Sequence, residues 1–423
     1  MTAQKADIKS AQLNEVSGVR VQMKKRPTPF PKTGISEGEV LEAVRSRLKK
    51  NVDPQRNWAQ FGPQAHPFAK KVFSIPEGLD SYAVEWASDI FPGILEMSQE
   101  AVRMIGALLG ARNPAGFITT GGTEANLMAI RLARNLAKKS RPEFIVPYSR
   151  HYSFDLAEEL FGVKMRTVEV NQDYSPKMEK VQKLINKNTV ALVCAAPEGN
   201  LGGIDPVEQF SEIAEENDLY FHVDSAVGGF LLPFMRKLGY NIPSFDFSLR
   251  SVCSMTADPH KLGLCVRPAG GFIVRDVSFF ERAVDIKRLQ IDTIVASGRP
   301  GSAAAAVWAL IKHLGTNGYT QLVRHTIEIT RMLADRVRQI DGLSLLREPQ
   351  TNMVCFTSDN PVVIQKVAKR LWAKGYAFPL TQLSPYKTMY IRFYVHPLKE
   401  TTSATALIGD LEDAARNVRR RFH

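Results

Sequence analysis

Apolar and polar positions alternate along this chain in a way that predicts strands and helices in turn. Short apolar runs are typical of buried strands, whereas apolar residues three and four apart predict helices. From residue 98 the expected elements are a helix over 98–109, a helix opened by the loop 119–123 and running to about 139, strand 144–147, helix 154–161, strand 164–170, helix 176–185, strand 190–194, helix 206–216, strand 219–223, and strands 251–255 and 271–274. This order implies βαβ units, so the predicted fold class is α/β with a mostly parallel sheet.

Three parts are expected along the chain. Residues 1–95 read as an N-terminal arm and segment that pack on another surface: prolines disfavour a helix before residue 35, a first helix begins near Ser36, and 51–95 is irregular and rich in aromatic residues. Residues 96–340 form the large domain, which ends with helices over 302–314 and 320–340. Residues 341–423 form a small α+β domain, with strands at 343–346, 352–356 and 389–395 and helices at 362–374 and 402–419.

Composition excludes several classes of protein. Hydrophobic residues make up 44% and charged residues 23%, which are ordinary globular values and argue against disorder or a fibrous repeat. The four cysteines lie far apart, so neither a metal site nor a disulfide scaffold is expected, and a cytoplasmic location is favoured. No apolar stretch approaches the length of a membrane span. The net charge of +12 comes from scattered lysines and arginines, so we expect no nucleic-acid partner.

Four features carry candidate chemistry. A glycine-rich T-T-G-G-T-E at 119–124 opens a helix, where backbone N–H groups bind phosphate. His151 follows a strand, and Asp224 ends one, where ligands bind in open α/β sheets. Lys261 lies in D-P-H-K, just past another strand. Taken singly, the first three also fit a tight turn, a structural histidine and a helix N-cap.

Together the four features describe a site for pyridoxal 5′-phosphate (PLP). This cofactor needs an amine for its aldehyde, a carboxylate for its pyridine nitrogen, a phosphate cradle and a group on the face of its ring. Lys261, Asp224, the loop 121–123 and His151 supply one of each.

The motifs resemble the group II PLP-dependent decarboxylases, a family of fold-type I. "TTGGTEANLMA" looks like their phosphate loop, "HYSFDLA" like their ring-stacking histidine segment, "HVDSAVGGF" like their aspartate strand and "ADPHKLG" like their lysine motif. The resemblance runs from about residue 91 to 318 and continues more weakly to the C-terminus. It implies an aspartate-aminotransferase-like large domain and a small C-terminal α+β domain.

The resemblance also assigns roles to residues. Lys261 would form the internal aldimine, Asp224 would pair with the pyridine nitrogen, Ala226 would lie under the ring and His151 would stack on its other face. These three residues, Lys261, Asp224 and His151, are the expected catalytic ones. The residues expected to hold the phosphate are Gly121, Gly122, Thr123 and His260.

Two branches of the family compete. "FPGILEMSQEAVRM", "AAPEGNLGGIDPV" and "SGRPGSAAAAVW" look like sphingosine-1-phosphate lyases, whereas "DPHKLGLCVRPAGGFIVRD" and the compact length look like archaeal tyrosine/aspartate decarboxylases. The chain departs from both. It has no tyrosine between Tyr240 and Tyr319, Gly298 stands where relatives carry serine or threonine, and Glu198 replaces a neutral residue near the ring.

The leading hypothesis is therefore α-decarboxylation of an L-amino acid through an external aldimine and a quinonoid. The alternative is retro-aldol cleavage of a phosphorylated amino alcohol, as in the lyases, for which a second phosphate site is needed. Two less favoured alternatives are a decarboxylation-dependent oxidase and a binding protein without turnover. The candidate substrate-binding cations are Arg299 and Arg392, with Lys287 and Arg288 as further candidates for the second phosphate. The family also implies a homodimer with a shared active site, in which residues 1–95 would pack on the dimer partner.

Overall fold

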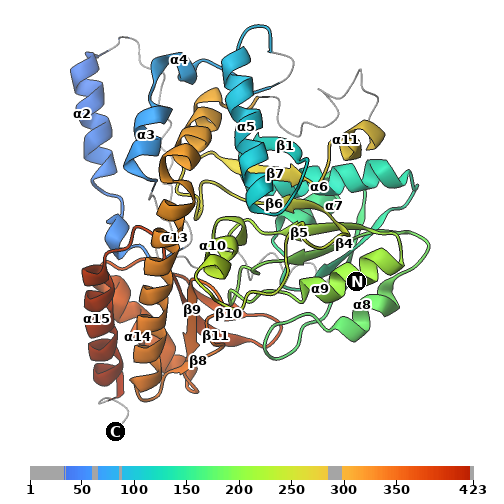
Figure 1. Ribbon diagram of the computed structural model, residues 1–423. Helices are drawn as coiled ribbons and strands as arrows, with labels where there is room; N and C mark the ends of the chain where they lie inside the picture. The colour runs from blue at the N-terminus through green and yellow to red at the C-terminus, as the bar shows by residue number, and fades with distance from the viewer. Residues whose placement is uncertain (1–32, 34, 60–64, 85–87, 284–297, 420–423) are drawn as a thin grey trace.

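From residue 143 onward the strands of the larger sheet lie where the sequence predicts them, and the structure adds one earlier strand over residues 115–119. The computed structural model describes residues 33, 35–59, 65–84, 88–283 and 298–419, and within them this sheet has the strand order β1-β7-β6-β5-β4-β2-β3 (Figure 1). Its strands are β1 (Ala115–Thr119), β2 (Glu143–Pro147), β3 (Lys164–Val168), β4 (Thr189–Ala195), β5 (Tyr220–Asp224), β6 (Val252–Thr256) and β7 (Gly270–Val274).

One strand runs against the others. β7 pairs antiparallel with both β1 and β6, whereas the remaining neighbours pair in parallel. The carboxyl ends of β1, β6, β5, β4 and β2 therefore lie at one edge of the sheet, together with the amino end of β7. Ligands bind at this edge in open α/β sheets, so the topology gathers the loops that follow these strands into one place.

Helices cover both faces of the larger sheet. Side chains alternate along each strand, so that Ile118 and Phe221 enter one apolar core while Phe117 and Tyr220 enter another. The first core also contains residues of α5 (Pro92–Leu108), α9 (Val207–Glu216) and α10 (Leu232–Lys237). The second contains residues of α6 (Gly122–Ala137), α7 (Ser153–Phe161) and α11 (Ser278–Ala283). The helix α8 (Met178–Leu184) follows β3. A sheet buried on both faces explains why its strands read as continuous apolar runs.

The long helix α13 (Gly301–Gln339) joins the two sheets. The sequence predicts two helices here, with a break near residues 315–319. The structure confirms two helical segments, which meet at a kink at Gly315, where φ is +53°. Glycine adopts this conformation without steric cost, which explains the kink. The first half of α13 packs in the core with α5, and its second half packs in the core of the smaller sheet.

The smaller sheet is antiparallel and lies near the C-terminus (Figure 1). Its order is β10-β11-β9-β8, and it packs against α14 (Pro361–Ala373) and α15 (Thr401–Arg419). The strands are β8 (Ser344–Leu345), β9 (Met353–Thr357), β10 (Leu380–Leu383) and β11 (Thr388–Tyr394). The α+β character predicted for this part is confirmed, with β10 as a strand that the sequence did not reveal.

The N-terminal part is more helical than expected. The helix α2 (Glu37–Leu48) begins at the predicted place, because Ser36 and Glu39 form a capping box. Within the described residues of 51–95, a segment predicted to be irregular, lie η1 (Pro54–Arg56), α3 (Pro67–Phe73), α4 (Pro76–Leu79) and the start of α5. Proline is the first residue of each of these helices, a position that suits it. The predicted arm over 1–35 lies almost wholly outside the described residues.

Across the part of the chain that the structure describes, no helix combines the length and the apolar character needed to cross a membrane.

Candidate active site

The predicted site residues meet at the edge of the larger sheet where its parallel strands end. Asp224 is the last residue of β5 and pairs in register with Thr256, the last residue of β6. Lys261 follows β6 by five residues, and Gly121 is the N-cap of α6, two residues after β1. The sequence prediction placed these side chains at strand ends, and the strand order makes those ends neighbours.

A buried carboxylate connects the lysine to the glycine loop. Oδ2 of Asp258 lies 3.1 Å from Nζ of Lys261 and accepts a hydrogen bond of 3.0 Å from the backbone N–H of Gly122. The side chain of Asp258 is fully buried, and burial raises its pKa, while the nearby Lys261 opposes that rise. The charge pair therefore holds the lysine in place beside the N-terminus of α6. Asp258 is not among the predicted site residues, although its position three residues before Lys261 is a signal in the sequence.

The two glycines leave room that a side chain would close. A Cβ on Gly122 would lie 2.6 Å from Oδ2 of Asp258, and one on Gly121 would lie 3.2 Å from Cε1 of His260. His260 lies across the loop, with Nδ1 accepting from the N–H of Ala269. Burial lowers the pKa of His260 to about 3, so the ring is neutral near pH 7. A helix N-terminus bared by glycines suits a phosphate group, and this cradle fits that of PLP.

Asp224 is held by two donors. Its Oδ2 accepts a hydrogen bond of 2.8 Å from Nδ2 of Asn126, and its Oδ1 accepts one of 3.1 Å from the N–H of Ala226. The carboxylate is mostly buried, with 9% of the residue exposed. A fixed carboxylate at this place fits the pyridine nitrogen of PLP. Lys261, Asp224 and the glycine cradle together supply the amine, the acceptor and the phosphate site that the cofactor needs.

His151 interacts electrostatically with Asp224, Asp258 and Lys261. Although the residue is exposed, the protein atoms around its ring desolvate it and so lower its pKa; Asp224 and Asp258 oppose the shift and Lys261 adds to it. Its Nδ1 faces Oγ of Ser153 at 2.9 Å. The neighbouring Tyr152 has its ring centroid 4.3 Å from that of His151, and its hydroxyl is 3.3 Å from Oγ1 of Thr123. The histidine segment and the phosphate loop are therefore in direct contact.

The two candidate substrate cations occupy different surroundings. Arg299 is 1% exposed; its Nε lies 3.9 Å from Oε1 of Glu124 and its Cζ lies 4.1 Å from the ring centroid of Phe117. Arg392, on β11, donates from Nη1 to the carbonyl oxygens of Gly199 and Asn200. Residues 199 and 200 follow β4, whose last residue, Ala195, pairs with Asp224. Lys287 and Arg288 lie outside the described residues.

The two unusual residues of the sequence have local explanations. The carboxylate of Glu198 accepts hydrogen bonds from the N–H groups of Asn200, Leu201 and Gly203. These bonds stabilise the local loop over residues 198–203. Burial raises the pKa of Glu198. A Cβ on Gly298 would lie 3.0 Å from Cε1 of Tyr82, so the tyrosine ring fills the space of a larger side chain.

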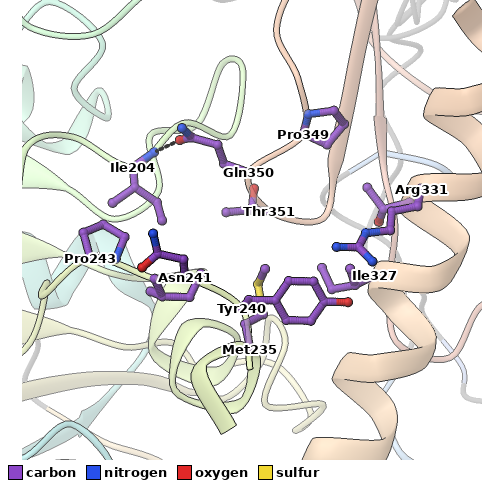
Figure 2. Close-up of a pocket in the computed structure, with 12 residues that line it drawn as sticks. Ile204, Met235, Tyr240, Asn241, Pro243, Ile327, Arg331, Pro349, Gln350 and Thr351 are labelled. Atoms are coloured by element: carbon purple, nitrogen blue, oxygen red, sulfur yellow. Dashed lines mark hydrogen bonds between the residues drawn. The ribbon is translucent and has the colours of Figure 1, made fainter. Parts of the chain in front are cut away.

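A separate pocket of about 260 Å³ lies between the loop after α10, the helix α13 and the segment before β9 (Figure 2). Figure 2 shows Tyr240, Arg331 and Gln350 on three of its sides, with Gln350 accepting a hydrogen bond of 2.9 Å from the N–H of Ile204. The residues that line it include none of the predicted site residues.

Comparisons with known proteins agree with the geometry. Residues 78–359 match the family model of the pyridoxal-dependent decarboxylase conserved domain. The L-aspartate decarboxylase of Thermococcus kodakarensis is 36% identical over 92% of this chain and 100% of its own length. The probable L-tyrosine/L-aspartate decarboxylase of Methanothermobacter thermautotrophicus is 40% identical over 82% of this chain and 94% of its own. Among solved structures, a sphingosine-1-phosphate lyase of Burkholderia pseudomallei superposes with a TM-score of 0.81 at 28% identity, covering 94% of this chain and 96% of that one.

Proposed function

This chain belongs to the pyridoxal-dependent decarboxylase family, and we propose that it decarboxylates L-aspartate, with L-tyrosine as the second candidate. It is a fold-type I, PLP-dependent carboxy-lyase of amino-acid metabolism. The choice of aspartate is supported by the names of relatives that match nearly the whole chain. The main evidence for the site is that Nζ of Lys261 and the N–H of Gly122 both lie within hydrogen-bond distance of Oδ2 of Asp258. This group lies beside Asp224.

The proposed roles follow from where each side chain lies. When bound, PLP supplies an electron-poor ring that accepts the electron pair left on Cα as the carboxylate departs. Lys261 provides the amine that holds the cofactor. Asp224, fixed by Asn126 and Ala226, keeps a proton on the pyridine nitrogen and so keeps the ring electron-poor. Gly121, together with the other predicted cradle residues, receives the phosphate.

A proton must return to Cα after the carboxylate leaves. Nζ of Lys261 and Nε2 of His151 are the two groups proposed for this transfer, because both side chains belong to the cluster around Asp224 and Asp258. The site opens at the edge of the sheet, where His151 is exposed. The substrate would enter over this histidine.

Arg392 is the proposed partner of a substrate carboxylate. Arginine carries five N–H donors, and the contacts of Nη1 with Gly199 and Asn200 leave the rest of its planar fork for a carboxylate. Arg299 is a poorer candidate, since its guanidinium is buried between Glu124 and Phe117. We assign Arg299 a role in supporting the phosphate loop instead.

The second candidate function is retro-aldol cleavage of a phosphorylated amino alcohol. It is favoured by the likeness in structure to a sphingosine-1-phosphate lyase at 28% identity. Its weakness is the second phosphate site, because the burial of Arg299 removes one of the four candidate cations for that site.

A substrate panel tests the proposal. The purified protein, loaded with PLP, is incubated with L-aspartate, L-tyrosine, L-glutamate and a phosphosphingoid base, and the products are identified by mass spectrometry. Release of carbon dioxide and β-alanine from L-aspartate is the expected result. A long-chain aldehyde with phosphoethanolamine would instead establish the lyase, and an aldehyde with peroxide from an amino acid would establish the oxidase.

We further propose that the chain works as a homodimer with a shared site, in three parts divided near residues 95 and 340. The helix α2 carries an apolar stripe, Val40, Leu41, Val44 and Leu48, and each of these side chains is 42–59% exposed in the single chain. A stripe of this kind is typical of a surface that packs on a partner. Sedimentation of the full chain should give twice the chain mass, and a monomer at micromolar concentration would contradict the proposal.

A further inference from the structure

The side chain of Asn126 is the centre of a buried hydrogen-bond network under the candidate site. Asn126 lies on α6 and is 1% exposed. Its Nδ2 donates to Oδ2 of Asp224 at 2.8 Å and to Oγ of Ser153 at 3.0 Å. On the other side of the amide, Oδ1 accepts from Oγ1 of Thr256 at 2.6 Å and faces Nε2 of His222 at 3.2 Å. Residues of three other elements, β5, β6 and α7, thus contact this one amide of α6.

Asp224 determines how this amide is oriented. A carboxylate only accepts hydrogen bonds, so the nitrogen of Asn126 must face Asp224 and the oxygen must face Thr256 and His222. Reversing the amide would place an oxygen 2.8 Å from the carboxylate and leave the Thr256 hydroxyl without its acceptor. Because the group is buried, such an arrangement would carry the full cost of unsatisfied polar atoms.

The orientation fixes the tautomer of His222. Its Nε2 faces the accepting oxygen of Asn126, so the proton is on Nε2, and Nδ1 accepts from Oγ of Ser254 at 2.8 Å. Burial lowers the pKa of His222 to about 4, which keeps the ring neutral at neutral pH. In this neutral form each polar atom of the His222 ring has a partner of the right kind.

The same reasoning extends from Asn126 to His151. The second N–H of Asn126 donates to the oxygen of Ser153, so the Ser153 hydroxyl proton points to Nδ1 of His151, 2.9 Å away. The backbone N–H of Ser153 also donates to this Nδ1, at 3.3 Å. Nδ1 of His151 therefore accepts two hydrogen bonds. A neutral His151 must then carry its proton on Nε2, at the opposite edge of the ring.

We propose that Asn126 is a positioning residue that, acting through Ser153, fixes the proton of His151 on Nε2, so that His151 meets the substrate as a hydrogen-bond donor. The inference rests on the proposed function insofar as it places His151 beside the substrate. A donor at this position is complementary to a substrate carboxylate. The lowered pKa of His151 supports the neutral form that the network requires.

Nuclear magnetic resonance reads the tautomer directly. A long-range ¹H–¹⁵N correlation spectrum of the full chain, ¹⁵N-labelled in its eight histidines, separates protonated from unprotonated ring nitrogens. His151→Gln and His222→Gln assign the two signals. We expect protonated Nε2 and bare Nδ1 for both rings at pH 7.5. A proton on Nδ1 of His151, or a doubly protonated ring, would overturn the proposal. The spectrum needs no turnover, so it separates this inference from the choice of substrate.

Variants test whether Asn126 is the cause. Asn126→Asp removes both N–H donors without changing shape, and it should shift the His151 signals towards a mixed tautomer. It should also weaken PLP binding about 10- to 100-fold, the usual effect of losing a hydrogen bond to a charged group. Ser153→Ala should alter the His151 signals with less effect on PLP affinity, because Asp224 keeps its donor.

Matched controls separate this effect from general damage. Asn352→Asp makes the same change at a fully buried asparagine whose Nδ2 donates to the carbonyl of Val395, and Ser211→Ala removes a buried hydroxyl bonded to Ser251. Both should leave the His151 signals and PLP affinity unchanged. If Asn126→Asp does not fold, Ser153→Ala serves instead, because it removes the hydroxyl that links Asn126 to His151. Wild-type His151 signals in the folded Asn126 or Ser153 variant would overturn the proposal.

Discussion

The amine of Lys261 lies 3.1 Å from Oδ2 of Asp258, a carboxylate that is fully shielded from solvent. The same oxygen accepts the N–H of Gly122, so one buried carboxylate joins the loop after β6 to the first turn of α6. The amine proposed to hold the cofactor and the loop proposed to hold its phosphate are thus fixed relative to each other before any cofactor binds. Such preorganisation is what a site built from separate strand ends requires.

Replacing Asp258 should destabilise the cofactor-free protein more than the PLP-bound protein. Asp258→Asn leaves the Lys261 ammonium without its partner, and breaking a buried pair in this way costs about 3–5 kcal/mol at full burial. Lys261 is 15% exposed, so a smaller loss is expected. Covalent attachment of the cofactor consumes the amine, and the loss of thermal stability should shrink when PLP is bound.

Thermal unfolding with and without PLP checks this expectation. Asp246→Asn is the matched control, because Asp246 is also buried and paired, with Arg236, and its side-chain partners, Arg236 and Ser248, are not predicted site residues. The control should lose the same stability in both forms. An equal loss in both forms for Asp258→Asn would contradict the account.

Arg392 should govern substrate binding rather than cofactor binding. Arg392→Met removes the proposed partner of the substrate carboxylate, and KM for L-aspartate should rise about 10- to 100-fold, as for other lost hydrogen bonds to charged groups. Arg392→Lys keeps the charge but not the planar fork, so an intermediate KM is expected. Steady-state kinetics and a PLP titration measure both effects. A lower kcat at unchanged KM would argue against this role.

Asp205 should make stability depend on pH. It lies in the loop after β4, and burial, reinforced by Glu198, raises its pKa from 3.8 to about 8. Between about pH 4 and 8 the folded protein holds a proton that the unfolded chain releases, so the free energy of unfolding falls as pH rises through this range. In Asp205→Asn that contribution is absent. Thermal midpoints measured from pH 5 to 9 should fall less steeply for Asp205→Asn than for the wild type, and identical slopes would refute the assignment.

Arg299 and Glu124 should behave as a coupled pair. Oε2 of Glu124 accepts from the N–H and the hydroxyl of Thr120, so the pair supports the start of the phosphate loop. Arg299→Met and Glu124→Gln should each lower stability, and the double variant should lose less than their sum by about 1–3 kcal/mol. Urea unfolding of the wild type, the two single variants and the double variant measures this coupling free energy. Additive losses would show that the two side chains act independently.

The order of strands and helices was predictable because strands buried on both faces leave continuous apolar runs. The confirmed elements include the strands that precede Asp224 and Lys261. β1 was missed because it contains Gly116, and the reason for that glycine is tertiary: a Cβ there would lie 1.9 Å from the carbonyl oxygen of Phe272 on β7. Nothing in the local pattern of β1 reveals which strand will approach it.

The same limit applies to the site. The motifs identified candidates at strand ends, and the topology brings these together. The supporting residues Asn126, Ser153 and Thr256 were not identified, because they come from two helices and a strand and meet only through the packing of α6 and α7 on the sheet. The burial of Arg299 was equally invisible, since a lone arginine in a glycine- and proline-rich segment reads as exposed.

The central claim is that Lys261 holds the cofactor in an amino-acid decarboxylase. Borohydride reduction of the PLP-loaded protein makes the bond between cofactor and lysine permanent, and peptide mapping by mass spectrometry then locates it. The account predicts modification of Lys261 and loss of carbon dioxide release from L-aspartate in the reduced protein. Modification of another lysine, with Lys261 untouched and decarboxylation lost, would contradict it.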